Sequence, residues 1–230
     1  MMRFLRLMLD WSEVWALLLP LIVLIFKRNQ PHYLKPVIIY LFFAFFINLA
    51  GDIIGDFTRA LPQWLQSNNI LYNVHSTIRF ICFSYFFLLL KQPSFITLKK
   101  VIPFISLFII IINFKYLETF ANPGHLSGNL LATEAYFLLI YCVLYYLAKL
   151  RSEEDDLTWG PDFWVATGLS IYVVVNFFVF LFYVPMIEQN SKMADHIWDV
   201  HNVAYIILCI FIAKAFYGPA QYQRAVQGNL

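Results

Sequence analysis

Charge is scarce in this sequence. Only 13% of its 230 residues are Asp, Glu, Lys or Arg, whereas a typical soluble domain carries roughly a quarter. Hydrophobic residues make up 61% of the chain, and 19% of all residues are aromatic. So much apolar surface cannot be buried inside a water-soluble domain of this length. The shortage of charge therefore excludes an ordinary soluble protein and points to the lipid bilayer as the main partner of the chain.

Other features are also missing. The net charge is only +2 and the basic residues form no cluster, which excludes the basic face of a nucleic-acid-binding protein. The three cysteines, Cys82, Cys142 and Cys209, all lie inside apolar stretches, so we expect them to fill the core rather than to form disulfides. Residues 1–10 contain two arginines but no small-residue cleavage site. We interpret them as an interfacial lead-in and not as a cleaved signal peptide.

Long apolar runs make up most of the chain. There are seven, rich in Leu, Ile and Phe, at 11–26, 36–55, 69–90, 101–114, 129–147, 161–187 and 194–217. A helix that spans a membrane needs about 20 mostly apolar residues. No linker between the runs is long enough to separate domains. We therefore predict an all-α membrane protein with a lead-in at 1–10, one seven-helix transmembrane domain at 11–217 and a short cytoplasmic tail at 218–230.

Basic residues near the helix ends predict the orientation, because cytoplasmic loops are enriched in Lys and Arg. One side of the predicted bundle has Lys27, Arg28, Lys35, Lys91, Lys99, Lys100, Lys149, Arg151, Lys214 and Arg224. The other side has Arg3, Arg6, Arg59, Lys115 and Lys192. This bias predicts an N-terminus outside and a C-terminus in the cytoplasm.

Two short segments of the chain echo each other. YNVHS at 72–76 matches WDVHN at 198–202, and Pro36 and Asn48 precede the first segment much as Pro161 and Asn176 precede the second. Runs one to three and five to seven then form a 3+1+3 parallel repeat. Such repeats occur in transporters, whose sites lie near the repeat interface. Apolar helices share letters easily, so a chance match stays open.

Polar residues inside the runs are the candidates for function, because ionisable groups in a membrane usually face the bundle interior or a wet cavity. In the predicted orientation, almost all of them fall in the outer half of the bundle, and Glu13 lies near the outer end of the first run. The candidate ligand-binding residues are Asp52, His75, Ser76, Arg79, Glu134, Asn176, Asp199, His201 and Asn202. These residues predict a polar cavity open to the outside. Alternatively they only pair with one another, Arg79 with Asp52 or Glu134, and His75 with Asp199.

Three functions are compatible with these residues. The leading hypothesis is a receptor or sensor, not an enzyme, that binds a small polar or anionic ligand through Arg79 and the two histidines. The first alternative is a small-solute transporter whose path is lined by Asn48, Asn176, Ser76 and Asn202. The second is a metal-dependent intramembrane hydrolase with His75, His201 and either Asp56 or Asp199 as ligands, although the sequence has no HExxH or HxxxH spacing. No cofactor is indicated.

Three blocks of sequence resemble a known family. They are NILYNVHSTIRFICFSYFF (69–87), PDFWVATGLSIYVVVNFFVFLF (161–182) and IWDVHNVAYIILCIFIAKAF (197–216). They are similar to an abundant, mostly uncharacterised family of seven-helix integral membrane proteins of Bacteroidetes, some of which are associated with sensor histidine kinases. The resemblance implies a sensory role for a multi-pass protein of the bacterial inner membrane, but it does not identify a ligand. Because the tail at 218–230 is too short for a signalling domain, we expect output through a separate signalling protein. The family pattern has Glu-Phe where this chain has Arg79 and Phe80, so the family's ligand and partner do not carry over to this chain directly.

Overall fold

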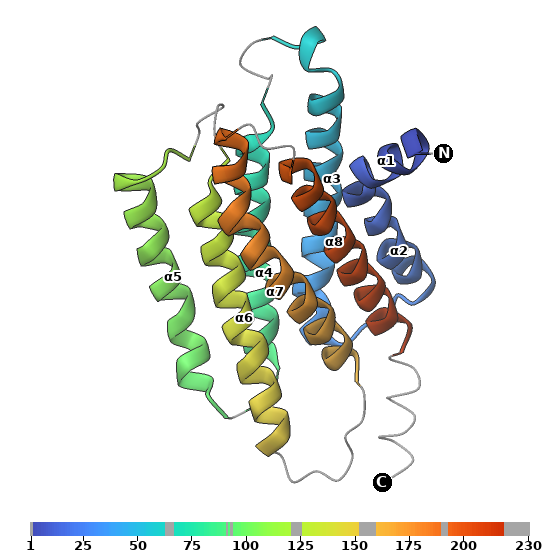
Figure 1. Cartoon of the computed structure of the whole chain (residues 1–230). Coiled ribbons are helices and arrows are strands. Elements are labelled where there is room, and N and C mark those ends of the chain that lie inside the picture. The colour runs from blue at the N-terminus through green and yellow to red at the C-terminus, as the bar shows by residue number, and fades with distance from the viewer. Residues whose placement is uncertain are drawn as a thin grey trace.

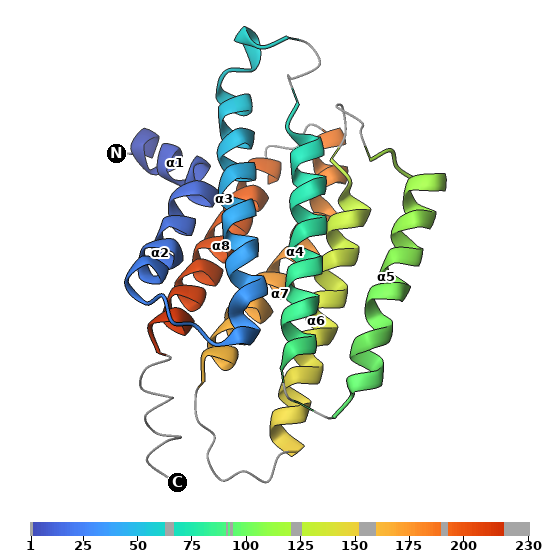
Figure 2. The same cartoon turned by 180° about the vertical axis from the view of Figure 1, so that it is seen from behind.

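Helices make up most of the part of the chain that the computed structural model describes, which is residues 2–62, 67–90, 92, 94–120, 126–151, 160–189 and 193–218. Its helices run up and down beside one another in a bundle (Figures 1 and 2). The predicted all-α class is thus confirmed. The predicted tail, apart from Gly218, lies outside the described residues.

Each predicted apolar run corresponds to one helix, from α2 to α8, and the short helix α1 precedes the first run. The elements are α1 (Met2–Asp10), α2 (Ser12–Phe26), η1 (His32–Leu34), α3 (Lys35–Asp56), η2 (Thr58–Ala60), α4 (Asn69–Leu89), α5 (Ile96–Tyr116), α6 (Gly128–Arg151), α7 (Pro161–Glu188) and α8 (Met193–Tyr217). Pro36 and Pro161 stand in the first turns of α3 and α7. Proline is tolerated there because the first backbone N–H groups of a helix have no partner within the helix. The helix α1 covers the predicted lead-in.

Five helices of the described chain are long and apolar enough to cross a membrane. They span His32–Asp56, Ile96–Tyr116, Gly128–Arg151, Pro161–Ile187 and His196–Tyr217. The helix α2 has only 15 residues, and α4 carries polar and charged side chains inside the bundle. The chain is therefore a multi-pass membrane protein. Seven spans, the 3+1+3 repeat and the orientation in the membrane stay predictions.

The helices alternate in direction, so the bundle has two distinct ends (Figure 1). The N-terminal end contains α1, the starts of α2, α4, α6 and α8, and the ends of α3, α5 and α7. The opposite end contains the remaining helix termini, and Lys27, Lys35, Lys149 and Lys214 lie there. The helix α8 packs against α2 and α7, and α6 lies between α4 and α7. The helix α5 stands at one edge of the bundle in both views.

Aromatic side chains dominate the core. Tyr40, Tyr141, Tyr145, Tyr172 and Tyr205 are among the largest fully buried side chains. Five buried hydroxyl groups are costly in an apolar interior unless they find hydrogen-bond partners. The cysteines Cys82, Cys142 and Cys209 are buried and free, as predicted. The tyrosines thus bring polar atoms into a core that consists mainly of apolar side chains.

Candidate functional site

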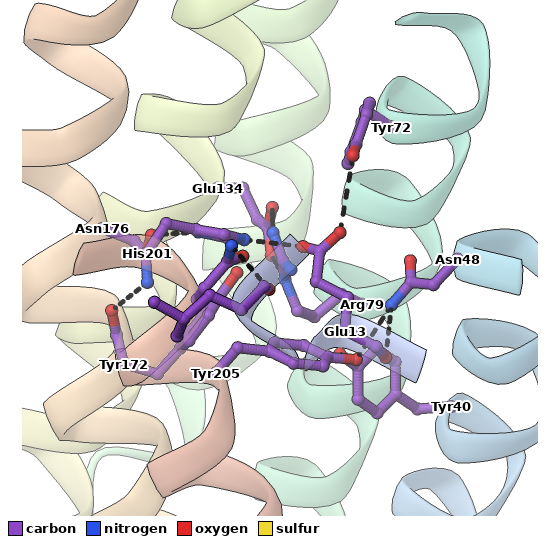
Figure 3. A network of polar contacts seen from close by, with 12 residues as sticks. Glu13, Tyr40, Asn48, Tyr72, Arg79, Glu134, Tyr172, Asn176, His201 and Tyr205 are labelled. Atoms are coloured by element: carbon purple, nitrogen blue, oxygen red, sulfur yellow. Dashed lines mark hydrogen bonds and ion pairs between the residues drawn. The ribbon is translucent and has the colours of Figure 1, made fainter. Parts of the chain in front are cut away.

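A buried polar cluster lies where α2, α3, α4, α6, α7 and α8 meet (Figure 3). Most of its members stand in the half of their helix nearer the N-terminal end of the bundle. Polar groups are collected there because facing lipid would leave them without hydrogen-bond partners. The polar cluster comprises Glu13, Tyr40, Asn48, Tyr72, His75, Ser76, Arg79, Glu134, Tyr172, Asn176, His201 and Tyr205.

The first charged pair of the cluster joins α4 to α6. Arg79 Nε donates to Glu134 Oε1 over 2.5 Å, and Arg79 Nη2 donates to Glu134 Oε2 over 2.7 Å. Ser76 lies three residues before Arg79 on the same helix face, and its hydroxyl donates to Glu134 Oε2 over 2.5 Å. The two charged side chains are only 4% and 2% exposed. Because this bidentate pair is electrically neutral, it is tolerated in the apolar interior.

The second pair joins α2 to α8. His201 Nε2 and Glu13 Oε1 lie 2.7 Å apart, with both side chains buried. The other ring nitrogen, Nδ1, contacts Asn176 Oδ1 on α7. Tyr72 on α4 donates to Glu13 Oε2 over 3.4 Å. One histidine and one carboxylate therefore hold four helices together.

Four rings lie between the two pairs, and we call Tyr40, His75, Tyr172 and Tyr205 the aromatic box. Tyr40 stacks on His75 with ring centroids 5.7 Å apart, and its hydroxyl lies 3.3 Å from that of Tyr205. Tyr205 is edge-on to His75 at 6.4 Å and lies 5.9 Å from Tyr172. The Tyr172 ring lies under the Arg79 guanidinium at 4.9 Å and beside His201 at 5.8 Å. The box therefore contacts both pairs.

Two polar atoms of the box have no partner among the described residues. They are His75 Nε2 and Tyr172 Oη. The two side chains are almost completely buried. A buried polar atom without a hydrogen bond costs about 1–3 kcal/mol, and in native proteins such an atom usually contacts water, an ion or a ligand. The box therefore offers two hydrogen-bonding positions to a bound molecule.

The structure brings six of the nine predicted ligand-binding residues into the cluster. These are His75, Ser76, Arg79, Glu134, Asn176 and His201. Asn48, predicted for the transporter, also belongs to it and donates to the Glu13 carbonyl over 3.2 Å. Of the two predicted partners of Arg79, Glu134 is confirmed.

The other three predicted residues make no hydrogen bond to the cluster that the structure describes. Asp199 is about 40% exposed and lies 3.8 Å from His196, so the predicted pairing of His75 with Asp199 is wrong. Asn202 donates to the Leu9 carbonyl over 3.1 Å and thereby ties α8 to α1. Asp52 is partly buried, and its Oδ2 has no hydrogen-bond partner among the described residues. Helical periodicity could not exclude these residues, because it does not say which neighbouring helix a face meets.

Glu13 and the three tyrosines of the box were missing from the predicted site. In the sequence, Glu13 is an acidic residue in the first turn of an apolar run, where acids commonly stabilise the helix N-terminus. The spacing of residues along the helices could have identified two of the tyrosines. Tyr172 precedes Asn176 by four residues and Tyr205 follows His201 by four, so each pair shares a helix face.

Metal ligands do not gather in the described part of the chain. No three His, Cys, Asp or Glu side chains there are placed to hold a metal ion together. His75 stacks on Tyr40, and His201 is held by Glu13 and Asn176. The cluster is thus built for hydrogen bonding and for paired charges.

Comparison of the chain with protein-family models, with curated proteins and with solved structures finds no match. The resemblance to the seven-helix Bacteroidetes family therefore stays a prediction. What is established is an all-helical protein with several long apolar helices and a buried polar cluster between them.

Proposed function

We propose that the chain is a membrane sensor whose aromatic box binds a small, uncharged polar molecule. The observation that carries this proposal is the pair of buried, unpartnered atoms His75 Nε2 and Tyr172 Oη, on rings that both contact Tyr205. A molecule with one hydrogen-bond donor and one acceptor would satisfy both atoms. It would also bridge α4 and α7, which carry the two residues.

The charges around the box favour an uncharged ligand over an anionic one. Two nitrogens of Arg79 are occupied by Glu134 at 2.5 and 2.7 Å. Because the pair with Glu134 is already neutral, an anion would bring an uncompensated negative charge into the buried site, which is costly. Glu13 is likewise held by His201 and Tyr72. A neutral ligand leaves both pairs intact.

A sensor requires that ligand binding changes the relative stability of two conformations. The box meets this requirement because its rings come from α3, α4, α7 and α8 and it contacts the pairs that join α2 to α8 and α4 to α6. In this proposal the ligand enters from the N-terminal end of the bundle, which faces the periplasm. The opposite, basic end faces the cytoplasm and transmits the change to a separate signalling protein of the inner membrane.

The variant Tyr172→Phe tests this proposal. Thermal unfolding of the purified protein is measured in detergent with a panel of sugars, polyols and small amides. We expect one class to stabilise the wild type, by about 2.7 kcal/mol at a hundredfold excess over Kd. Tyr172→Phe should lose this response but keep its stability without ligand, because the hydroxyl has no protein partner to lose.

The control for this experiment is Tyr145→Phe. The Tyr145 hydroxyl donates to Asp162 Oδ2 over 2.7 Å, so its removal should cost about 1 kcal/mol of stability while the ligand response persists. A full ligand response in Tyr172→Phe would contradict the proposal. So would a wild type that no compound of the panel stabilises.

A transporter is the second candidate, and the echoed sequence segments favour it. His75 and His201 occupy matching positions in the two segments, and Asn48 and Asn176 precede these segments at similar distances. All four side chains belong to the polar cluster. In a transporter, a cysteine in place of Asn176 should react with a membrane-impermeant maleimide from both sides of the membrane. Ser106→Cys on α5 is the control and should react from neither side. Reaction of Asn176→Cys from the N-terminal side alone would favour the sensor.

A further inference from the structure

The hydrogen bonds around His201 determine where the protons lie in its contact with Glu13. Asn176 Nδ2 donates to the Tyr172 carbonyl over 2.9 Å. This bond fixes the orientation of the amide, so that its oxygen faces His201 Nδ1. An amide oxygen only accepts hydrogen bonds. His201 Nδ1 must therefore carry a hydrogen.

The other ring nitrogen then has two possible states. If His201 is neutral, Nε2 carries a lone pair and no hydrogen, so Glu13 must be protonated to donate a hydrogen bond to it. If Nε2 also carries a hydrogen, His201 is an imidazolium and Glu13 a carboxylate. Without either proton, two lone pairs would face each other across 2.7 Å. The contact therefore requires one proton between Nε2 and Oε1 in both states.

We propose that Glu13 and His201 form a binding site for one exchangeable proton that joins α2 to α8. Transfer from Oε1–H to Nε2 converts a neutral acid and imidazole into a carboxylate and an imidazolium, and no atom leaves the site. Release of the proton leaves one negative charge in the buried contact. The lone pairs of Glu13 Oε1 and His201 Nε2 then face each other, so the contact that joined α2 to α8 becomes repulsive. This inference needs no ligand in the aromatic box.

Several titratable groups surround the site. Asp52 on α3 is close enough to Glu13 for the two carboxylates to repel each other, and a proton on the site relieves that repulsion. Arg79 is the one permanent cation of α4, and its charge is neutralised by Glu134 on α6. Other described titratable groups that interact with Glu13 or His201 are Tyr72 and His75 on α4, Tyr172 on α7, and Tyr205 and Cys209 on α8.

Tyr72 links the site to a narrow hollow of the bundle. The hollow lies between α3 and α4 and is lined by Ile47, Asn48, Gly51, Leu71 and Tyr72. Tyr72 lines this hollow and donates to Glu13 Oε2. Asp52 follows Gly51 near the end of α3, and its Oδ2 has no hydrogen-bond partner among the described residues.

Solid-state NMR of the full chain in lipid vesicles tests the site. The histidines are labelled with ¹⁵N and the glutamates with ¹³C at the carboxyl group, and spectra are recorded across a pH series without added ligand. The His201 signals are assigned by their loss in His201→Gln. We expect His201 Nδ1 to be protonated at every pH, while Nε2 and the Glu13 carboxyl change together as one proton is bound or released.

The variant Glu13→Gln separates this site from an ordinary buried histidine. The Gln side-chain amide donates to Nε2 without an exchangeable acid, so the pH-dependent change of the His201 Nε2 signal should be lost. His196→Gln is the matched control, since it removes an exposed histidine 3.8 Å from Asp199 and should leave the His201 signals unchanged.

Three outcomes would overturn the inference. They are an unprotonated Nδ1, a Glu13 carboxyl that stays constant while Nε2 changes, and an unchanged response in Glu13→Gln. If Glu13→Gln does not fold, the joint behaviour of Nδ1, Nε2 and the carboxyl in the wild type decides. Because no ligand is added, the result is independent of the compound panel, and either proposal can fail while the other stands.

Discussion

Arg79→Met is expected to lower the free energy of unfolding by about 3–5 kcal/mol, because it leaves the Glu134 carboxylate buried without its counter-charge. The guanidinium supplies two of the three hydrogen bonds that Glu134 receives, and Ser76 supplies the third. Water cannot replace the lost donors easily, since both side chains are less than 5% exposed. Thermal and denaturant unfolding of the purified protein in detergent measures the loss.

Two further variants establish the cause of this effect. The double variant Arg79→Met and Glu134→Met removes both charges and should recover most of the stability, because a buried pair replaced by apolar residues of similar volume is often neutral. Lys149→Met is the matched surface control. Lys149 lies 3.6 Å from Asp162 and is 35% exposed, so its loss should change stability by about 1 kcal/mol or less. A double variant as unstable as Arg79→Met would contradict the role of the unpaired carboxylate.

Gly168→Ala is expected to destabilise the bundle by about 1–3 kcal/mol through overpacking between α7 and α8. A Cβ atom at position 168 would lie 2.5 Å from Phe211 Cβ and 3.1 Å from its Cγ. The Cβ of Phe211 is fixed by its own backbone, so rotation of the ring cannot relieve the first contact. The two helices must move apart, and close helix approach through small residues is a main source of packing energy in membranes.

Gly51→Ala is the matched control for this substitution. Gly51 also lies within a long helix, but a Cβ there would meet no atom within 4 Å. Alanine is favoured over glycine inside a helix by about 0.5–1 kcal/mol, so Gly51→Ala should raise the unfolding temperature while Gly168→Ala lowers it. If both substitutions raise it, helix propensity and not the contact with Phe211 governs the result.

The helical architecture was predictable because it depends on local properties of the chain. An apolar run in lipid must satisfy its backbone hydrogen bonds within the segment, and a helix does this wherever the run lies. Every run therefore contains a helix, from α2 to α8. The number of membrane spans was harder to predict from the sequence. The helix α2 has only 15 residues and α4 carries polar side chains, so neither has the length and composition of an independent span. Neighbouring helices cover part of the surface of both.

The candidate site was predictable in part. His75, Arg79, Glu134 and His201 stand out in the sequence, since an ionisable group in a membrane helix must turn away from lipid. Tyr172 and Tyr205 did not stand out, because tyrosine is common both in helix cores and near membrane surfaces. Their role depends on the neighbours that the fold supplies, such as Arg79 over the ring of Tyr172.

The sequence by itself determined that this chain is helical, that it belongs in a membrane, and that a few polar residues must face the interior of a bundle. The tertiary structure alone decided which of them meet. His201 pairs with Glu13, which lies 188 residues away in the chain, and Arg79 pairs with Glu134 and not with Asp52. The reason is that the period of a helix defines its faces, whereas the partner of each face depends on how several helices rotate and pack against one another.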